Sequence, residues 1–160
     1  ARLRQCLVGM WWGNKMVTLN WCLQQKNGIE LIEPSENLSQ SYFKEAKETL
    51  LQIHGTGSKW EVIMGYYACY HALYAVLQKA GVKSEIHDCT IELMPLIKAF
   101  TVKEYHFLKD LKRRRIDAQY YLKPEKLETS VPIKKFLLRC EEIAQDLDIE
   151  VLRGKINAQK

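Results

Sequence analysis

The chain has 160 residues, of which 47% are hydrophobic, and it carries a formal net charge of +5. This length is sufficient for one domain with a substantial core, and the hydrophobic content excludes a disordered chain. The sequence has no run of about 18 apolar residues, so we predict no membrane-spanning helix.

The cysteines are odd in number, widely spaced and without a CxxC pair. They are Cys6, Cys22, Cys69, Cys89 and Cys140. This pattern favours reduced thiols over a disulfide framework or a zinc site. We therefore predict a cytoplasmic protein that holds no metal and no cofactor.

Residues 1–37 are interpreted as an N-terminal extension. Asn14 and Lys15 interrupt its apolar patch and no small-residue cleavage site follows, which argues against a secretory signal. Because Met16 is a plausible first residue of the native protein, we interpret residues 1–15 as upstream or non-native sequence. Asn27 and Gly28 predict a turn.

Residues 38–53 and 60–80 predict two helices of different character. The first has one apolar stripe with Lys and Glu opposite, and Ser35 or Ser39 is its expected N-cap. The second is apolar nearly all round, which is typical of a helix buried by its neighbours. One side of it carries Trp60, Ile63, Tyr67, His71, Tyr74 and Gln78, and a separate strip carries Ala68, Ala72 and Ala75. Small residues allow close helix approach, so this helix should be the spine of a bundle.

The second half of the chain continues the helical pattern. Gly81 is placed as a helix C′ residue, Ser84 as the N-cap of a short helix, and Pro95 as its end. A basic helix is expected over 103–122, and Ser130 with Pro132 opens a last amphipathic helix. Nothing alternates like a strand. The predicted class is all-α, with a bundle over 38–150 and a tail over 151–160.

The positive charge is concentrated between residues 98 and 135. This segment has 11 Lys and Arg against 5 Asp and Glu, while the rest is near neutral. Such a segment attracts phosphates, although a solvated helix face gives the same count. Lys112, Arg113 and Arg114 form the candidate basic patch.

Arg115 falls on the apolar side of the basic helix. The stripe there comprises Phe107, Leu108, Leu111, Ala118 and Leu122, with Gln119 at its edge. An unpaired buried charge is unfavourable. Arg115 should therefore ion-pair inside the bundle, line a cleft that admits an anion, or extend its head group to solvent at the edge of the core. Arg113 and Asp117 fall on the opposite side as a solvent-exposed i,i+4 pair.

Two histidines are candidates for a site. His71 shares a face with Tyr67, which fits a hydrogen-bonded core histidine as well as a site residue. His87 lies near a helix start, where the helix dipole disfavours its protonation. HExxH, GxxxxGK[ST], GxGxxG and GxSxG motifs are absent from the sequence, so zinc-protease, P-loop, dinucleotide-binding and hydrolase functions have no support.

Three segments in this order resemble the HEPN domain family. They are YYACYHALYAVLQKAG (66–81), SEIHDCT (84–90) and RRRIDAQYY (113–121). The similarity is greatest to small stand-alone prokaryotic and archaeal HEPN proteins with an RxxADY-type helix, and it covers about residues 16–150. It implies an antiparallel up-and-down bundle of four to five helices that dimerises around a basic cleft. Many members of that family are ribonucleases or toxins paired with a small nucleotidyltransferase, and others are thought to bind nucleotides or RNA without cutting.

In the family members that cleave RNA, the helix that corresponds to residues 103–122 carries an Arg that is followed, after four to six residues, by a His. Here the positions at those offsets from the three arginines hold Gln119, Tyr120 and Tyr121. Glutamine does not titrate and tyrosine loses its proton only near pH 10, so we expect no catalysis by this motif. His87 or His71 is the alternative proton carrier.

The expected function is binding of a nucleotide or RNA phosphate in a basic cleft. Arg115 would be the phosphate ligand, and the other candidate residues are Gln119, Tyr120, Tyr67, His71 and His87. The resemblance adds a homodimer and a nucleotidyltransferase partner. The alternatives are a metal-independent ribonuclease toxin of a toxin–antitoxin pair and a non-catalytic protein-interaction module.

Overall fold

The computed structural model describes residues 16–160 and is predominantly helical, which confirms the all-α class. The elements in chain order are α2 (Leu19–Gln24), β1 (Glu30–Leu31), α3 (Glu36–Leu51), α4 (Lys59–Lys79), β2 (Val82–Lys83), α5 (His87–Glu92), the 3₁₀-helix η2 (Met94–Leu96), α6 (Val102–Tyr120), α7 (Val131–Gln145) and α8 (Ile149–Asn157).

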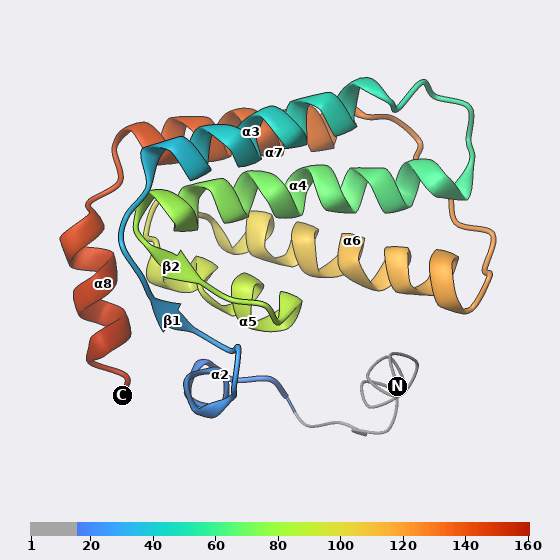
Figure 1. Cartoon of the computed structure of the whole chain (residues 1–160). Helices are drawn as coiled ribbons and strands as arrows, with labels where there is room; N and C mark the ends of the chain where they lie inside the picture. Colours follow the sequence, from blue (N-terminus) through green and yellow to red (C-terminus); the bar gives the residue numbers. More distant parts are fainter. Residues whose placement is uncertain (1–15) are drawn as a thin grey trace.

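Helix α4 is the centre of the fold. It packs against α3, α6 and α7, which surround it in Figure 1, and successive long helices run in opposite directions. Its alanines Ala68, Ala72 and Ala75 are fully buried, as a close approach of helices requires. The prediction that α4 is the spine is confirmed.

The helix ends follow local capping chemistry. The Ser35 hydroxyl accepts from the backbone N–H of Leu38 and begins α3, so Ser35 rather than Ser39 is the N-cap. After α4, Gly81 adopts a φ of 65°, and a Cβ placed there would lie 2.3 Å from the carbonyl oxygen of Ile32. Only glycine fits this close approach of the chain to the end of α4.

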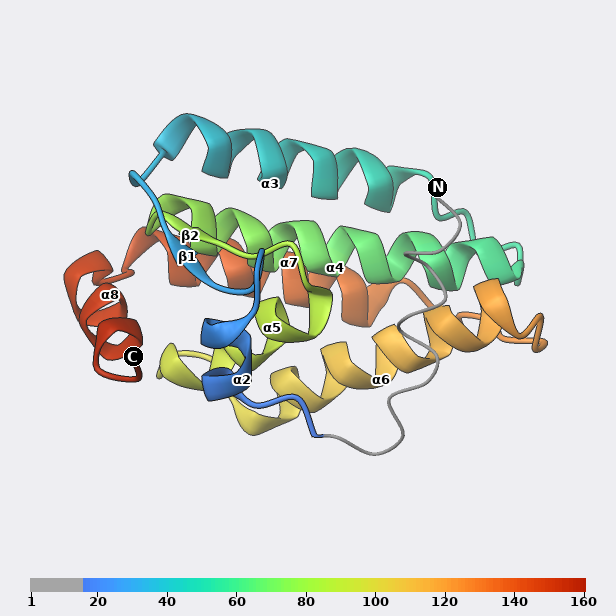
Figure 2. The ribbon, with the colours of Figure 1, turned by 60° about the horizontal axis from the view of Figure 1, so that its bottom comes forward.

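Two short strands depart from the prediction of an entirely helical chain. β1 pairs antiparallel with β2, with Glu30 opposite Lys83 and Leu31 opposite Val82. Each strand has two residues, which is too short for an alternating pattern. The pair holds the N-terminal segment beside the loop that follows α4, as Figure 2 shows.

The C-terminal segment is also more ordered than predicted. Residues 149–157 form α8, and Leu152 and Ile156 are buried, so the expected tail is instead a packed helix. The guanidinium of Arg153 donates hydrogen bonds to the carbonyl oxygens of Ile32, Ala80 and Gly81. The interpretation of residues 1–15 as upstream sequence lies outside the described residues.

Three predicted positions differ in the structure. Ile86, rather than Ser84, is the N-cap of α5, and the Ser84 hydroxyl donates to the Ile86 carbonyl. Trp60 is 58% exposed, although Glu61 and Val62, which follow it in the first turn of α4, are buried. Leu122 is 71% exposed, because α6 ends at Tyr120 and the chain turns away with a φ of 54° at Leu122.

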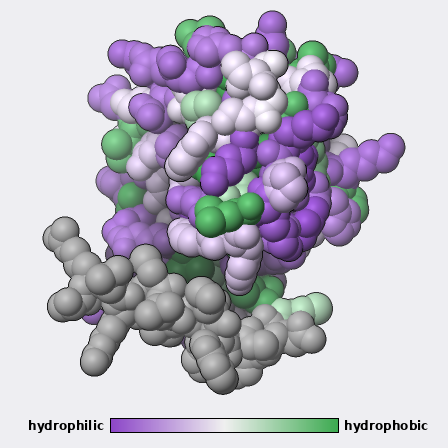
Figure 3. Space-filling model, turned by 90° about the vertical axis from the view of Figure 1, so that its right-hand side faces the viewer, coloured by the Kyte–Doolittle hydropathy of each residue, from purple (hydrophilic) through white to green (hydrophobic). Residues whose placement is uncertain are grey.

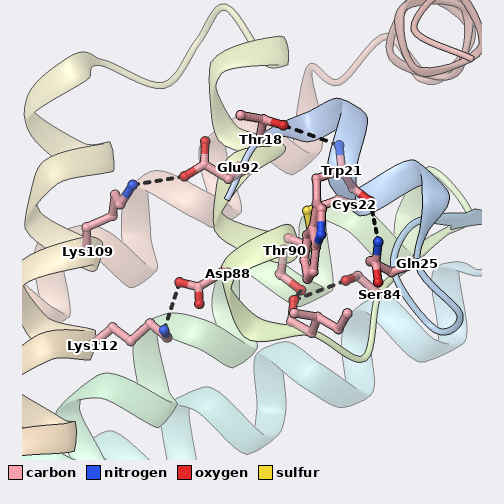
Figure 4. The surroundings of a disulfide bond; sticks show 12 residues. Thr18, Trp21, Cys22, Gln25, Ser84, Asp88, Thr90, Glu92, Lys109 and Lys112 are labelled. Carbon is pink, nitrogen blue, oxygen red and sulfur yellow. Dashed lines mark hydrogen bonds and ion pairs between the residues drawn. A yellow bond between two sulfur atoms is a disulfide. The ribbon is translucent and has the colours of Figure 1, made fainter. Parts of the chain in front are cut away.

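A disulfide joins Cys22 of α2 to Cys89 of α5 (Figure 4). Both residues are fully buried, and Cys69 and Cys140 are buried free thiols. The prediction of reduced thiols was therefore wrong for this pair, whose separation of 67 residues matches no motif. Disulfides are typical of oxidising compartments, so the cysteine pattern no longer favours a cytoplasmic protein.

Candidate anion-binding site

Arg115 lies inside the bundle, as its position on the apolar stripe predicts. It is only 9% exposed, and its Nη2 donates a hydrogen bond of 2.6 Å to the hydroxyl of Tyr67 on α4. Its guanidinium carbon lies 5.2–5.5 Å from the ring centres of Tyr66, Tyr67 and Tyr120. These rings stabilise the cation through their negative faces.

No carboxylate neutralises this guanidinium. Arg115 takes part in no ion pair within residues 16–160, and residues 1–15 contain no Asp or Glu. Within the described chain its Nε is buried and has no hydrogen-bond partner. A buried charge without a counter-ion is unfavourable, so the arrangement is suited to accept an anion.

Two further candidate residues also have unsatisfied buried atoms. Oε1 of Gln119 on α6 and Nδ1 of His71 on α4 are buried without hydrogen-bond partners among the described residues. The ring of His71 lies 6.1 Å from that of Tyr67, and burial lowers the pKa of His71. Polar atoms in this state are rare in folded proteins and often mark a place where water or a ligand binds.

His87 is brought into the same cluster from α5. Its Nδ1 lies 2.7 Å from the Tyr66 hydroxyl, and its ring stacks on Tyr70 at 4.1 Å. Burial, followed by the positive charges of Arg115 and Lys112, lowers the pKa of His87 to about 4. The imidazole is therefore neutral near pH 7. Burial, rather than the dipole of this six-residue helix, is the main cause.

The predicted basic patch is present, but its charges are paired. Lys112 contacts Asp88 at 2.7 Å, Arg114 contacts Glu125 at 2.9 Å, and Arg113 contacts Asp110 at 2.7 Å. Arg113 also contacts Asp117, as the i,i+4 spacing predicts. Asp117 is nevertheless buried rather than solvated, and the hydrogen bond from Lys123 is the main reason that its pKa lies below the ordinary value.

Three hollows of the described surface are not lined by Arg115. A small one of about 180 Å³ is lined by Asp88, Lys112, Arg113 and Asp117 among others, and two of about 470 and 590 Å³ lie elsewhere. Of the three rings around the guanidinium, that of Tyr120 at the end of α6 belongs to an exposed residue, with a fractional exposure of 56%. Hydrophilic side chains dominate that end of the molecule (Figure 3).

Sequence reasoning missed two residues of the site. Tyr66 and Tyr70 contact His87 from α4. Their sequence positions did not indicate this, because α4 is buried nearly all round and its periodicity does not distinguish one face as the site. The combination of four tyrosines and a histidine on one buried helix was the available signal, since their polar ends need partners.

No family model, no curated protein and no solved structure matches this chain. The resemblance to HEPN domains therefore stays a prediction. Among residues 16–160, no helix is long and apolar enough to cross a membrane, and no group of three His, Cys, Asp or Glu is placed to hold a metal ion.

Proposed function

We propose that this protein is a HEPN-like helical bundle that binds the phosphate of a nucleotide or RNA at Arg115. The observation that carries the proposal is the guanidinium of Arg115, which is nine-tenths buried and, among residues 16–160, has no carboxylate partner and no hydrogen-bond acceptor for its Nε–H. A phosphate oxygen is an acceptor that matches this donor in charge and geometry. Gln119, Tyr120, Tyr67, His71 and His87 line the site.

The chemistry of the surrounding rings supports a phosphate over a protein carboxylate as the ligand. Arg115 is enclosed by tyrosines, and Tyr120 presents an exposed aromatic face next to the charge. Aromatic faces stack with nucleobases, and an adjacent cation holds the phosphate. A nucleotide uses both features, whereas an acidic side chain uses only one.

Filter binding with labelled RNA and with a labelled nucleotide tests the proposal. Arg115→Ala should abolish binding, while Arg113→Ala, which removes the same charge from an exposed and ion-paired position of the same helix, should leave most of it. Wild-type affinity should fall steeply with salt. Equal affinity of wild type and Arg115→Ala would remove Arg115 from the role. Failure to bind nucleic acid at any salt concentration, with capture of a protein partner, would favour the interaction module.

The resemblance adds two parts to the proposal, namely a homodimer and a small nucleotidyltransferase partner. Light scattering during size-exclusion chromatography tests the dimer. Co-purification with the product of a neighbouring nucleotidyltransferase gene tests the partner. A monomer at all concentrations would remove the shared basic cleft but leave the Arg115 site intact.

Metal-independent RNA cleavage is the second candidate, and the position of His87 favours it. Tyr66 and Tyr67 each pack against both His87 and Arg115, so a proton-carrying ring and a phosphate ligand share one cluster although the family's Arg–His spacing is missing. Cleavage of RNA in EDTA that is lost in His87→Gln would support it. Intact RNA after long incubation with wild type would exclude it.

A further inference from the structure

We propose that His87 supplies a second, proton-dependent positive charge to the Arg115 site, so that the preferred ligand is a dianionic phosphate monoester and its binding takes up a proton. This inference rests on the proposed function, and it specifies the chemical class of the ligand. Phosphate monoesters occur on free nucleotides and at the ends of processed RNA, and both sources share this chemistry.

The geometry links His87 and Arg115 through two tyrosines. The Tyr66 hydroxyl contacts Nδ1 of His87 at 2.7 Å, and the Tyr66 ring lies 5.4 Å from the guanidinium carbon of Arg115. The Tyr67 ring lies edge-on to His87 with centres 6.1 Å apart, while its hydroxyl accepts from Arg115. Both cationic groups therefore adjoin the same pair of rings.

Tyr66 can support His87 in both protonation states. In the neutral tautomer that carries its hydrogen on Nε2, Nδ1 of His87 accepts a hydrogen bond from the Tyr66 hydroxyl and Nε2 remains a donor. When His87 becomes an imidazolium, Nδ1 donates and the phenol oxygen accepts after a rotation of its O–H. Burial raises the pKa of Tyr66, so the phenol stays protonated in either state. No side chain has to move for the charge to change.

The charges around His87 favour its neutral form only while the site is empty. Arg115 and Lys112 face His87 from α6, and Asp88 is the next residue of α5. Burial is the largest cause of the low pKa of His87, and Arg115 is the largest of the charges that act on it. Lys112 and Asp88 are paired at 2.7 Å and act on this pKa in opposite directions. The groups that face His87 from α4, namely Tyr66, Tyr67, Tyr70 and His71, bring no negative charge near pH 7.

A dianion at Arg115 reverses the effect of the charges, while the burial of His87 continues to oppose its protonation. One negative charge offsets the guanidinium, and the second favours the protonated imidazole, since an opposite charge nearby raises the pKa of a histidine. A phosphodiester carries a single negative charge, which Arg115 alone neutralises. Discrimination between monoester and diester therefore follows from the proton that His87 takes up.

Inorganic sulfate is the sharpest first probe, because it keeps both negative charges across the pH range of interest. For wild type, affinity should fall about tenfold per pH unit as pH rises from about 5 to 7, and the NMR signals of His87 should change to those of an imidazolium on binding. His87→Gln should bind sulfate more weakly at the low end of this range, with no dependence on pH. His106→Gln, which changes an exposed histidine of α6, should match wild type.

The second arm compares an RNA oligonucleotide carrying a 5′-phosphate with the same oligonucleotide lacking it, together with a nucleoside monophosphate. Wild type should bind the phosphorylated RNA at least tenfold more tightly near pH 6, and His87→Gln should bind both RNAs equally. A preference for the nucleoside monophosphate over phosphorylated RNA identifies the free nucleotide as the source.

The two proposals fail in different ways. Sulfate binding by wild type that is independent of pH, or identical in His87→Gln, overturns the role of His87 while Arg115-dependent binding still supports the phosphate site. If neither RNA, nucleotide nor sulfate binds in an Arg115-dependent manner, the proposed function fails and the present inference fails with it.

Discussion

Arg115 combines burial, positive charge and an Nε–H that has no acceptor in the described part of the chain. Folding of the empty site therefore removes a charge from water without giving it a counter-ion, which costs free energy. The Tyr67 hydroxyl and the rings of Tyr66, Tyr67 and Tyr120 offset part of this cost. A side chain held at such a cost is typical of a residue kept for binding rather than for stability.

Stability and binding should be inversely related at position 115. Arg115→Met keeps the length of the side chain and removes its charge, so the free energy of unfolding should stay level or rise by up to about 4 kcal/mol while RNA or nucleotide binding is lost. Urea unfolding followed by circular dichroism measures the first quantity. A large loss of stability would show that the guanidinium is a structural element of the core.

The sequence predicted Arg115 more successfully than it predicted His87. Helical periodicity places Arg115 among Leu108, Leu111 and Ala118, and a single helix face is enough to infer burial. His87 reaches the site only because the segment after β2 folds back against α4 and α6. That path depends on tertiary contacts, which no local spacing encodes.

The loop between α3 and α4 is organised by one carboxylate. Glu61, only 2% exposed in the first turn of α4, accepts hydrogen bonds from the backbone N–H groups of His54, Thr56 and Gly57. Burial acts to raise its pKa, but these backbone hydrogen bonds hold the pKa below the ordinary value of 4.5. The carboxylate thus fixes a segment that contains two glycines with positive φ.

The pKa of Glu61 is lower in the folded chain than in the unfolded one, which sets the direction of its pH dependence. Its ionised form stabilises the fold fully above about pH 4.5, and this contribution is lost as pH falls through the folded-state pKa. Glu61→Gln should therefore be less stable than wild type at pH 7, and the difference should shrink in acid. Urea unfolding at a series of pH values tests this, with Glu33→Gln, an exposed change, as control.

Helix α6, which carries Arg115, begins with a reciprocal cap. The Thr101 hydroxyl accepts from the Glu104 N–H, and the Glu104 carboxylate accepts from the Thr101 N–H. Thr101→Ala should lower the free energy of unfolding by about 1 kcal/mol. Ser130→Ala is a matched control at the start of α7, because the Ser130 side chain makes no capping hydrogen bond. Equal losses in the two variants would contradict the capping role.

Across the whole molecule, the sequence specified the long helices and missed the connections between them. Helices α3, α6 and α7 each have an apolar stripe, and α4 is apolar nearly all round. Each helix is long enough for the 3.6-residue period to show in the sequence which of its residues are buried. The two-residue strands and the disulfide leave no such pattern, and the short helix α8 shows it in only two buried residues, Leu152 and Ile156. Each of them depends on residues far apart in sequence, as in the hydrogen bonds from Arg153 to Ile32 and Gly81.

The disulfide should account for a large share of the stability of this domain. It closes a loop of 67 residues. A cross-link over a loop of this size reduces the entropy of the unfolded chain and so raises the free energy of unfolding by about 4 kcal/mol. Dithiothreitol should lower the free energy of unfolding of wild type. It should not affect the double variant Cys22→Ala/Cys89→Ala, which should start from the lower value. Identical stability of wild type with and without the reductant would contradict this expectation.

The same covalent ring has a consequence for how the protein tolerates damage to its backbone. Helices α3 and α4, with the exposed glycine turn between them at residues 54–57, lie within the segment that Cys22 and Cys89 close. A protease that cuts this turn once will produce two pieces that migrate together on a gel under oxidising conditions and separate only after a reducing agent is added. A single cut there opens a ring without releasing a fragment.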